Sequence, residues 1–209
     1  MADLVSLELG RVAHLELVNP PLNLVTRELT EQLRDRLATL AAADDVRAVV
    51  VSGRGERAFS AGSDVKAFES YRGAAGREHF SREEEVFSQL AALPMPTIAA
   101  IEGNALGGGL ELALCCDIRV ASERASLGLP EVRLAVTPGA GGTQRLPRVV
   151  GVARAKELTL PAGSSTRTSR SASGLSVAWF LLARRWPRPT RLPLRSPSAA
   201  RWRYARSSV

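Results

Sequence analysis

The 209-residue chain is 45% hydrophobic and 23% charged, a composition typical of a globular protein with one sizeable core. Its net charge of +7 would indicate a nucleic-acid or acidic-membrane partner if it were evenly spread. However, residues 161–209 contain ten Arg and no acidic residue, which leaves 18 basic and 21 acidic residues in residues 1–160. We therefore expect one domain over residues 1–160 and a disordered or irregular Arg/Ser/Pro-rich tail over residues 161–209.

The N-terminus and the cysteines predict a cytoplasmic protein with reduced thiols. The first ten residues, MADLVSLELG, lack the basic start and long apolar run of a signal peptide. Cys115 and Cys116 are adjacent in an apolar run, which argues against a disulfide framework and gives no metal-ligand spacing. The apolar run at residues 178–183 is far shorter than the about 20 residues that span a bilayer.

The first 45 residues predict a hairpin followed by a helix. Val5–Glu8 and residues 11–18 alternate apolar and polar side chains around Gly10, as in two strands with one buried face. Thr26 is a candidate N-cap, and leucines at helical spacing follow it as far as an Asp-Asp break.

The middle of the chain predicts strands that alternate with helices. Residues 47–52 and Thr97–Ile101 have the composition of strands buried on both faces, and residues 83–93 between them have a helical pattern. Residues 103–109 form a glycine-rich loop that leads into a helix over residues 110–116. This alternation predicts an α/β fold.

The last part of the predicted domain adds a strand and two helical segments. Ile118–Ala121 has the composition of a short strand, and residues 139–150 and 152–160 have helical patterns.

The glycine-rich loop is the first candidate for chemistry. Gly107, Gly108 and Gly109 precede a helix, where exposed backbone N–H groups favour an anion or oxyanion, although close packing of loop on helix is the more common reason for such a cluster taken alone. The spacing fits neither GxGxxG nor the phosphate-binding GxxxxGK[ST] pattern, which weakens a nucleotide-binding interpretation.

Two glutamates are the next candidates. Glu111 lies in the first turn of an almost wholly apolar helix, where we expect it to be half-buried; it could also simply complement the helix dipole, by about 0.3 to 1 kcal/mol. Glu131 follows Pro130, which restricts Leu129 to an extended or turn conformation and could hold the carboxylate rigidly. The alternative is that Glu131 is an ordinary exposed turn residue.

Three long motifs, in their order and spacing, are similar to the crotonase (enoyl-CoA hydratase/isomerase) family. They are AFSAGSDVKAF, IAAIEGNALGGGLELALCCDIRVAS and LGLPEVRLAVTPGAGGTQRLPRVVG, and NPPLNLVTRELTEQL also resembles the family. The resemblance extends from the N-terminal hairpin to about Leu160. It implies the ClpP/crotonase fold of repeated ββα units and an acyl-CoA thioester as substrate.

The resemblance also implies roles for particular residues. The backbone N–H groups of Ser63 and Gly108 correspond to an oxyanion hole for the thioester oxygen, where fixed donors stabilise developing negative charge. Glu111 and Glu131 match the two glutamates of family members that add water across the 2,3 double bond of a 2-enoyl-CoA, with Glu111 helping to deprotonate water and Glu131 exchanging the α-carbon proton. No cofactor is expected, because coenzyme A is part of the substrate.

Other residues resemble the part of the family that lies along the CoA moiety. These are Ala61, Asp64 and Val65, with Leu22 a weaker candidate; Lys66 could meet a CoA phosphate or be an ordinary solvated lysine. The family resemblance implies a homotrimer or a dimer of trimers. The acyl chain stays open.

The sequence departs from the family after Leu160. Family members continue with a pattern like TGRxxDAxEAxxxGLV, whereas this chain continues PAGSSTRTSRS. A frameshift explains the change, because Pro161–Thr166 can be encoded so that the neighbouring frame reads Gly-Arg-Gln-Leu-Asp. We therefore expect a truncated family member whose missing C-terminal helices would normally complete the core and the oligomer.

Three alternatives to a hydratase remain. The chain could catalyse another acyl-CoA reaction such as isomerisation, although retention of both glutamates favours hydration. Its ten Arg with Trp and Tyr in the tail could bind nucleic acid, which we do not expect of the domain itself. Lastly, the chain could be an inactive product that aggregates through unfinished core surface.

Overall fold

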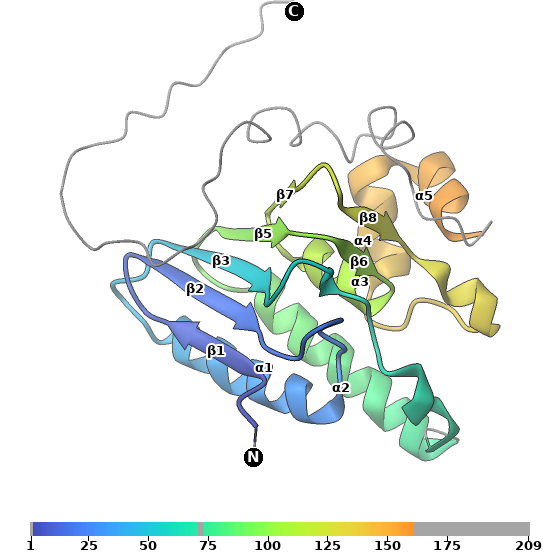
Figure 1. Ribbon diagram of the computed structural model, residues 1–209, viewed down its shortest axis with the longest axis horizontal. Coiled ribbons are helices and arrows are strands. Elements are labelled where there is room, and N and C mark those ends of the chain that lie inside the picture. The colour runs from blue at the N-terminus through green and yellow to red at the C-terminus, as the bar shows by residue number, and fades with distance from the viewer. Residues whose placement is uncertain (1, 71–72, 161–209) are drawn as a thin grey trace, which may run out of the picture.

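A five-stranded sheet forms the larger β layer of the fold, in the order β1-β2-β3-β5-β7. Its strands are β1 (Val5–Glu8), β2 (Val12–Leu17), β3 (Ala48–Gly53), β5 (Thr97–Ile101) and β7 (Ile118–Ala121). Strands β1 and β2 form the predicted antiparallel hairpin, and every other pair in this sheet is parallel. The structure, a computed structural model, describes residues 2–70 and 73–160; the predicted tail lies outside these residues (Figure 1).

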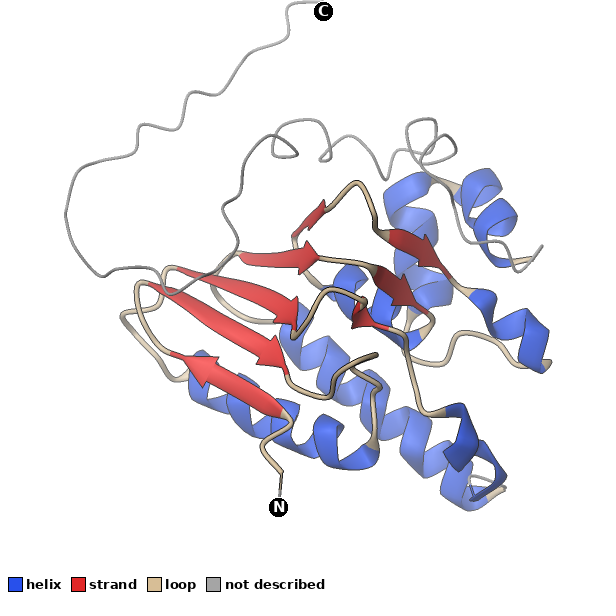
Figure 2. Ribbon diagram, viewed as in Figure 1, coloured by secondary structure: helices blue, strands red, loops and turns tan. Residues whose placement is uncertain are grey.

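A second sheet contains three short parallel strands, β4 (Ala58–Ser60), β6 (Asn104–Leu106) and β8 (Ser126–Gly128). The chain passes from β3 to β4, from β5 to β6 and from β7 to β8, so each passage adds one strand to each sheet (Figure 2). A helix follows each pair, which confirms the predicted α/β fold of repeated ββα units. The interpretation of residues 103–109 as a loop throughout is wrong, because β6 lies within them.

Helices follow the strand pairs and cover the sheets (Figure 1). They are α1 (Arg27–Ala41), α2 (Ala74–Ala91), α3 (Gly108–Cys115), α4 (Gly142–Val150) and α5 (Val152–Thr159), with 3₁₀ helices η1 (Val65–Ser70) and η2 (Pro130–Leu134). The predicted helix over residues 83–93 begins nine residues earlier, as α2.

Helix α1 shows why these sequences form these elements. The Thr26 hydroxyl accepts a hydrogen bond from the Leu29 amide at 3.2 Å, so Thr26 is the predicted N-cap. The leucines at helical spacing are all buried, and α1 packs beside α2 under the larger sheet (Figure 1). Burial of this apolar stripe, rather than helix propensity, holds α1 in place.

The larger sheet is buried more completely on one face than on the other. Val49 and Val51 of β3 are fully buried, whereas Val50 is only half-buried, and β5 alternates in the same way. The expectation that both faces of these strands are buried is therefore wrong: α1 and α2 cover only one face of the sheet (Figure 1).

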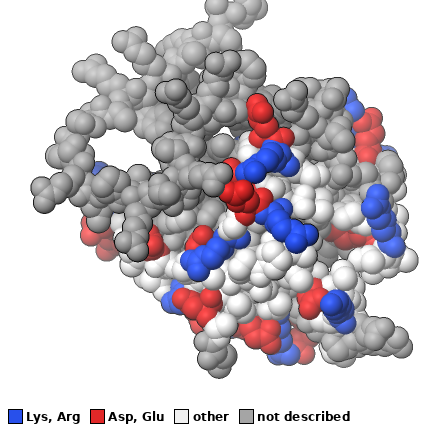
Figure 3. Space-filling view, in the orientation of Figure 1, with Lys and Arg blue, Asp and Glu red and all other residues white. Residues whose placement is uncertain are grey.

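The surface of the described residues carries both signs of charge. Basic and acidic side chains are interspersed on the face drawn in Figure 3, as the near balance of charge in residues 1–160 predicts. Within the described ranges, no helix is both long and apolar enough to cross a membrane.

Cys115 and Cys116 are buried free thiols, as predicted. Burial raises the pKa of Cys115 to about 12 and raises that of Cys116 further still. Both side chains therefore belong to the core and are protonated at neutral pH.

Candidate active site

The N-terminus of α3 packs directly against the end of β4 and the segment that follows it. A Cβ atom on Gly109 would lie 2.1 Å from the backbone oxygen of Ser60, so only glycine permits this approach. Gly62, with φ +91°, turns the chain beside α3. The glycine cluster therefore does serve close packing, and the same packing brings the amides of two distant segments together.

Ser63 and Gly108, the predicted oxyanion-hole residues, are neighbours in the structure. A Cβ atom on Gly108 would lie 3.2 Å from Ser63 Oγ and 3.6 Å from the Ser63 amide nitrogen. Gly108 is also the first residue of α3, where backbone N–H groups have no partner within the helix. Two backbone donors from separate segments therefore lie side by side at the positive end of a helix.

Glu111 is only 3% exposed, more deeply buried than the half-buried position expected from the sequence. Its Oε1 accepts hydrogen bonds from the amides of Ala140, at 2.9 Å, and Gly142, at 2.7 Å, where α4 begins. Burial raises the pKa of Glu111, and these two amide bonds oppose the rise. The N-terminus of α4 thus supports the charged form of a buried carboxyl group.

Glu131 reaches the same region from η2. Its Oε1 would lie 3.3 Å from a Cβ atom on Gly107, the residue immediately before α3. Both carboxyl oxygens are buried, and neither accepts a hydrogen bond from another of the described residues. Burial raises the pKa of Glu131 to about 7, and the charge of Glu111 contributes to the rise. Glu131 therefore favours the acid form more than Glu111 does.

The structure adds a third carboxyl group, Glu83 of α2, which is 1% exposed. Its Oε1 would lie 2.8 Å from a Cβ atom on Gly108, and the Ser63 hydroxyl donates to both of its carboxyl oxygens at 3.3 Å. Burial raises the pKa of Glu83 to about 8, with further contributions from the charges of Glu111 and Glu131.

Sequence reasoning missed Glu83, although a signal for it exists. The buried residues Val86, Phe87 and Leu90 follow Glu83 by three, four and seven positions. At this helical spacing Glu83 lies on the same, apolar face of α2. An acidic residue on the buried stripe of a helix is rare unless it is paired or functional.

The residues expected along the CoA moiety gather in one loop region. The Ala61 amide donates to the Leu22 backbone oxygen at 2.9 Å, and the Asp64 amide donates to the Val25 oxygen at 3.3 Å. Val65 and Lys66 follow in η1 and are exposed. The structure therefore brings Leu22 beside residues 61–64. The backbone amide of Lys66 donates to Asp64 Oδ1 at 3.0 Å.

Asn23 holds this loop region in place. Its buried side-chain amide donates to the backbone oxygens of Arg54, at 3.0 Å, and Ala58, at 2.8 Å, and so ties the loop before α1 to the β3–β4 connection. No three His, Cys, Asp or Glu side chains in residues 2–70 and 73–160 are grouped so that they could hold a metal ion.

An α/β fold of ββα units that brings paired amides and buried carboxyl groups to one helix end defines a class of protein whose site has the groups needed to stabilise an anion and to transfer protons. The family model for enoyl-CoA hydratase/isomerase matches residues 8–178, and the chain belongs to this family. The match extends past the domain boundary predicted at residue 160, which stays a prediction.

Relatives of known sequence and structure agree with this assignment. The chain is 39% identical over 143 residues to a crotonyl-CoA hydratase of Syntrophomonas wolfei, covering 68% of this chain and 55% of that one. It is 44% identical over 140 residues to the human mitochondrial methylglutaconyl-CoA hydratase, covering 67% of this chain and 41% of that one. A crystal structure of an enoyl-CoA hydratase from Bacillus anthracis superimposes with a TM-score of 0.79 at 40% identity, covering 83% of this chain and 68% of that one. The chain spans about half the length of the curated relatives that it matches.

Proposed function

We propose that the chain is an enoyl-CoA hydratase that adds water across the 2,3 double bond of a 2-enoyl-CoA to give a 3-hydroxyacyl-CoA. The observation that carries the proposal is a difference in hydrogen bonding between two buried carboxyl groups around the first turn of α3. Glu111 accepts two amide hydrogen bonds, whereas Glu131 accepts none from another described residue. Environments that separate the proton affinities of neighbouring carboxyl groups are typical of an acid and base pair.

The proposed mechanism assigns one role to each group. The amides of Ser63 and Gly108 hold the thioester oxygen and stabilise the negative charge that develops there, each donor being worth about 100- to 1000-fold in rate. Glu111 takes a proton from water while the water oxygen bonds to C3. The electrons of the double bond pass to the enolate, and the α-carbon then takes the proton of Glu131.

The reaction so written needs carboxyl groups, amides and water, so we propose no cofactor. Leu22, Ala61, Asp64 and Val65 are proposed to line the CoA moiety, with Lys66 near a phosphate. A cytoplasmic location and a homotrimer or dimer of trimers stay predictions of the same kind. Crotonyl-CoA and methylglutaconyl-CoA, named for two of the relatives, are the first substrates to test, with fatty acid or amino-acid catabolism as the corresponding context.

The test is hydration of crotonyl-CoA, followed by loss of the enoyl-thioester absorbance, with Glu111→Gln, Glu131→Gln and Glu85→Gln compared with the unchanged chain. Glu85 is an exposed residue of α2 and serves as the matched control. The first two variants should lose about 100- to 10,000-fold in kcat, the usual worth of general acid–base catalysis, and the third should lose nothing.

Two outcomes would refute the proposal. If a 3-enoyl-CoA is isomerised while 2-enoyl-CoA is not hydrated, the chain is an isomerase of the same family. If no thioester reacts, the activity assignment is wrong for this chain.

A further inference from the structure

Glu83 has no role in the proposed mechanism, yet it contacts both parts of the proposed oxyanion hole. Its carboxyl group accepts a hydrogen bond from the Ser63 hydroxyl at 3.3 Å. Its Oε1 lies 2.8 Å from the position that a Cβ atom on Gly108 would take. A carboxylate at this place would repel the negative charge that the hole has to stabilise, because Coulomb forces are strong in a buried site. A neutral carboxyl group would not.

The surroundings of Glu83 favour the neutral form. The charged and titratable groups that face it are His79, one turn earlier on α2, Glu111 from α3 and Glu131 from η2. Two of these are acidic, and within the described residues Glu83 forms no ion pair with a lysine or an arginine. Burial lowers the pKa of His79, and the charge of Arg27 from α1 lowers it further, so His79 also favours its neutral form.

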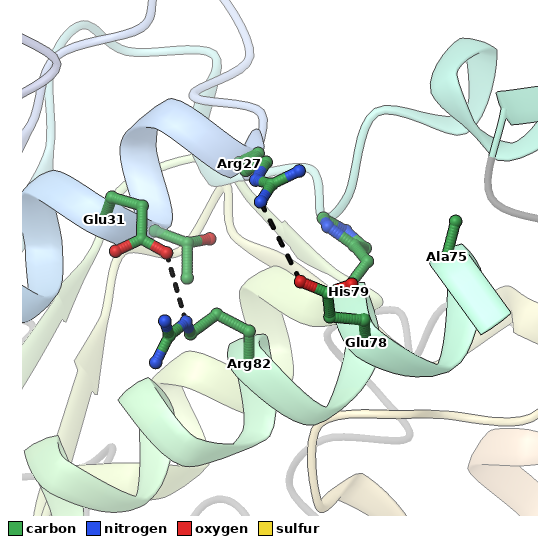
Figure 4. Close-up of a pocket in the computed structure, with 7 residues that line it drawn as sticks. Arg27, Glu31, Ala75, Glu78, His79 and Arg82 are labelled. Atoms are coloured by element: carbon green, nitrogen blue, oxygen red, sulfur yellow. Dashed lines mark ion pairs between the residues drawn. The ribbon is translucent and has the colours of Figure 1, made fainter.

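A surface pocket reaches His79, the neighbour of this buried group. The pocket has a volume of about 250 Å³ and lies between α1 and α2, where Arg27 pairs with Glu78 and Arg82 pairs with Glu31 (Figure 4). His79 lines the pocket and places its Nε2 3.6 Å from Glu83 Oε2. The imidazole thus stands between the pocket and the carboxyl group, at a distance that a small side-chain movement closes to a hydrogen bond.

We propose that Glu83 is a positioning residue of the oxyanion hole, which in its acid form braces Ser63 against Gly108 and exchanges its proton with the α1–α2 pocket through His79. The inference rests on the proposed hydratase activity. Ionisation of Glu83 then weakens the hole without removing any donor, so the enzyme requires two protonated carboxyl groups, Glu131 to supply the α-carbon proton and Glu83 to keep the hole neutral.

The test is the pH dependence of crotonyl-CoA hydration by the full chain. Where two acids must be protonated, log kcat/KM falls by about two units per pH unit above both pKa values, and where one must be, it falls by about one. Glutamine is neutral and has the shape of glutamic acid. In Glu83→Gln the fall of log kcat/KM should therefore change from about two units to about one unit per pH unit, and turnover at low pH should be kept. Glu83→Ala should lower kcat more than it raises KM, and Glu85→Gln should keep the two-proton fall.

A second measurement needs no turnover. The infrared carbonyl band of a protonated buried carboxyl group should titrate near pH 8 and vanish in Glu83→Gln but not in Glu85→Gln. Ser63→Ala removes a hydrogen bond that lowers the pKa of Glu83, so it should move this titration to higher pH. His79→Phe should slow the proton exchange of this band with deuterated solvent.

The outcomes separate the two proposals. A hydratase whose Glu83→Gln variant keeps the two-proton fall overturns the positioning role and leaves the proposed function standing. Absence of hydration with an intact Glu83 band overturns the proposed function. A band that does not titrate near pH 8, or that ignores Ser63→Ala, overturns the inference whether or not the chain is active.

Discussion

The buried carboxyl group of Glu83 predicts a specific dependence of stability on pH. Its pKa is about 8 in the folded chain against an ordinary value of 4.5, so between these pH values the folded state keeps a proton that the unfolded state loses. The stability contributed by the acid form is fully present below about pH 4.5 and is lost as pH rises through 8. A difference of one bound proton between the folded and unfolded states changes the free energy of unfolding by about 1.4 kcal/mol per pH unit.

Glu83→Gln removes this single proton and leaves Glu111 and Glu131 in place. Its free energy of unfolding, relative to that of the unchanged chain, should therefore rise between pH 5 and 8 by up to about 1.4 kcal/mol per pH unit. Urea unfolding followed by circular dichroism at several pH values measures the difference, and Glu85→Gln supplies the exposed control on the same helix. Parallel pH curves for Glu83→Gln and the unchanged chain would refute the reasoning, since Glu83 would then not be protonated in the folded state.

Three further predictions concern the site and the core. In Gly142→Ala the new Cβ atom would lie 2.8 Å from Glu111 Oε1, so the carboxyl group must shift, and kcat for crotonyl-CoA should fall by up to about 100-fold. Gly10→Ala is the control: its new Cβ atom would meet only the Val12 backbone oxygen, at 3.4 Å, and kcat should not change. Because the pKa of Glu131 is about 7, hydration should decline above that pH, and Glu131→Asp should shift the decline if this group supplies the proton. Cys115 and Cys116 should react with a thiol reagent only after unfolding, and rapid reaction of the folded chain would contradict their burial.

Local patterns were sufficient to predict the elements that begin and end the described chain. The β1–β2 hairpin and α1 depend on alternation, on leucine spacing and on the Thr26 cap, all of which are features of contiguous sequence. Strands β4, β6 and β8 have three residues each and pair with one another, in parallel, across long stretches of chain. Their pairing is non-local, so no short window of sequence contains it.

In the site, too, local motifs were predictable from the sequence and non-local contacts were not. The family motifs supplied Ser63, Gly108, Glu111 and Glu131, and the structure brings these four residues to one helix end, while their catalytic roles stay proposals. The depth of Glu111 was underestimated, because its burial depends on the α4 terminus that donates to it from 29 and 31 residues away in the sequence. Glu83 was missed because its partners lie on another segment, although its place on the apolar stripe of α2 was visible in the sequence.

Three carboxyl groups in one buried site would be unstable if all were ionised, since each would lose solvation and repel the others. The structure resolves this conflict by giving each a different environment. Amides at the start of α4 support a charge on Glu111. Among the described residues, no other residue donates such a bond to Glu131, and Glu83 accepts a hydrogen bond only from the Ser63 hydroxyl. One charge and two protons is therefore the arrangement that this site favours near neutral pH, and it matches the base, the acid and the neutral group beside the oxyanion that we propose for hydration of an enoyl thioester.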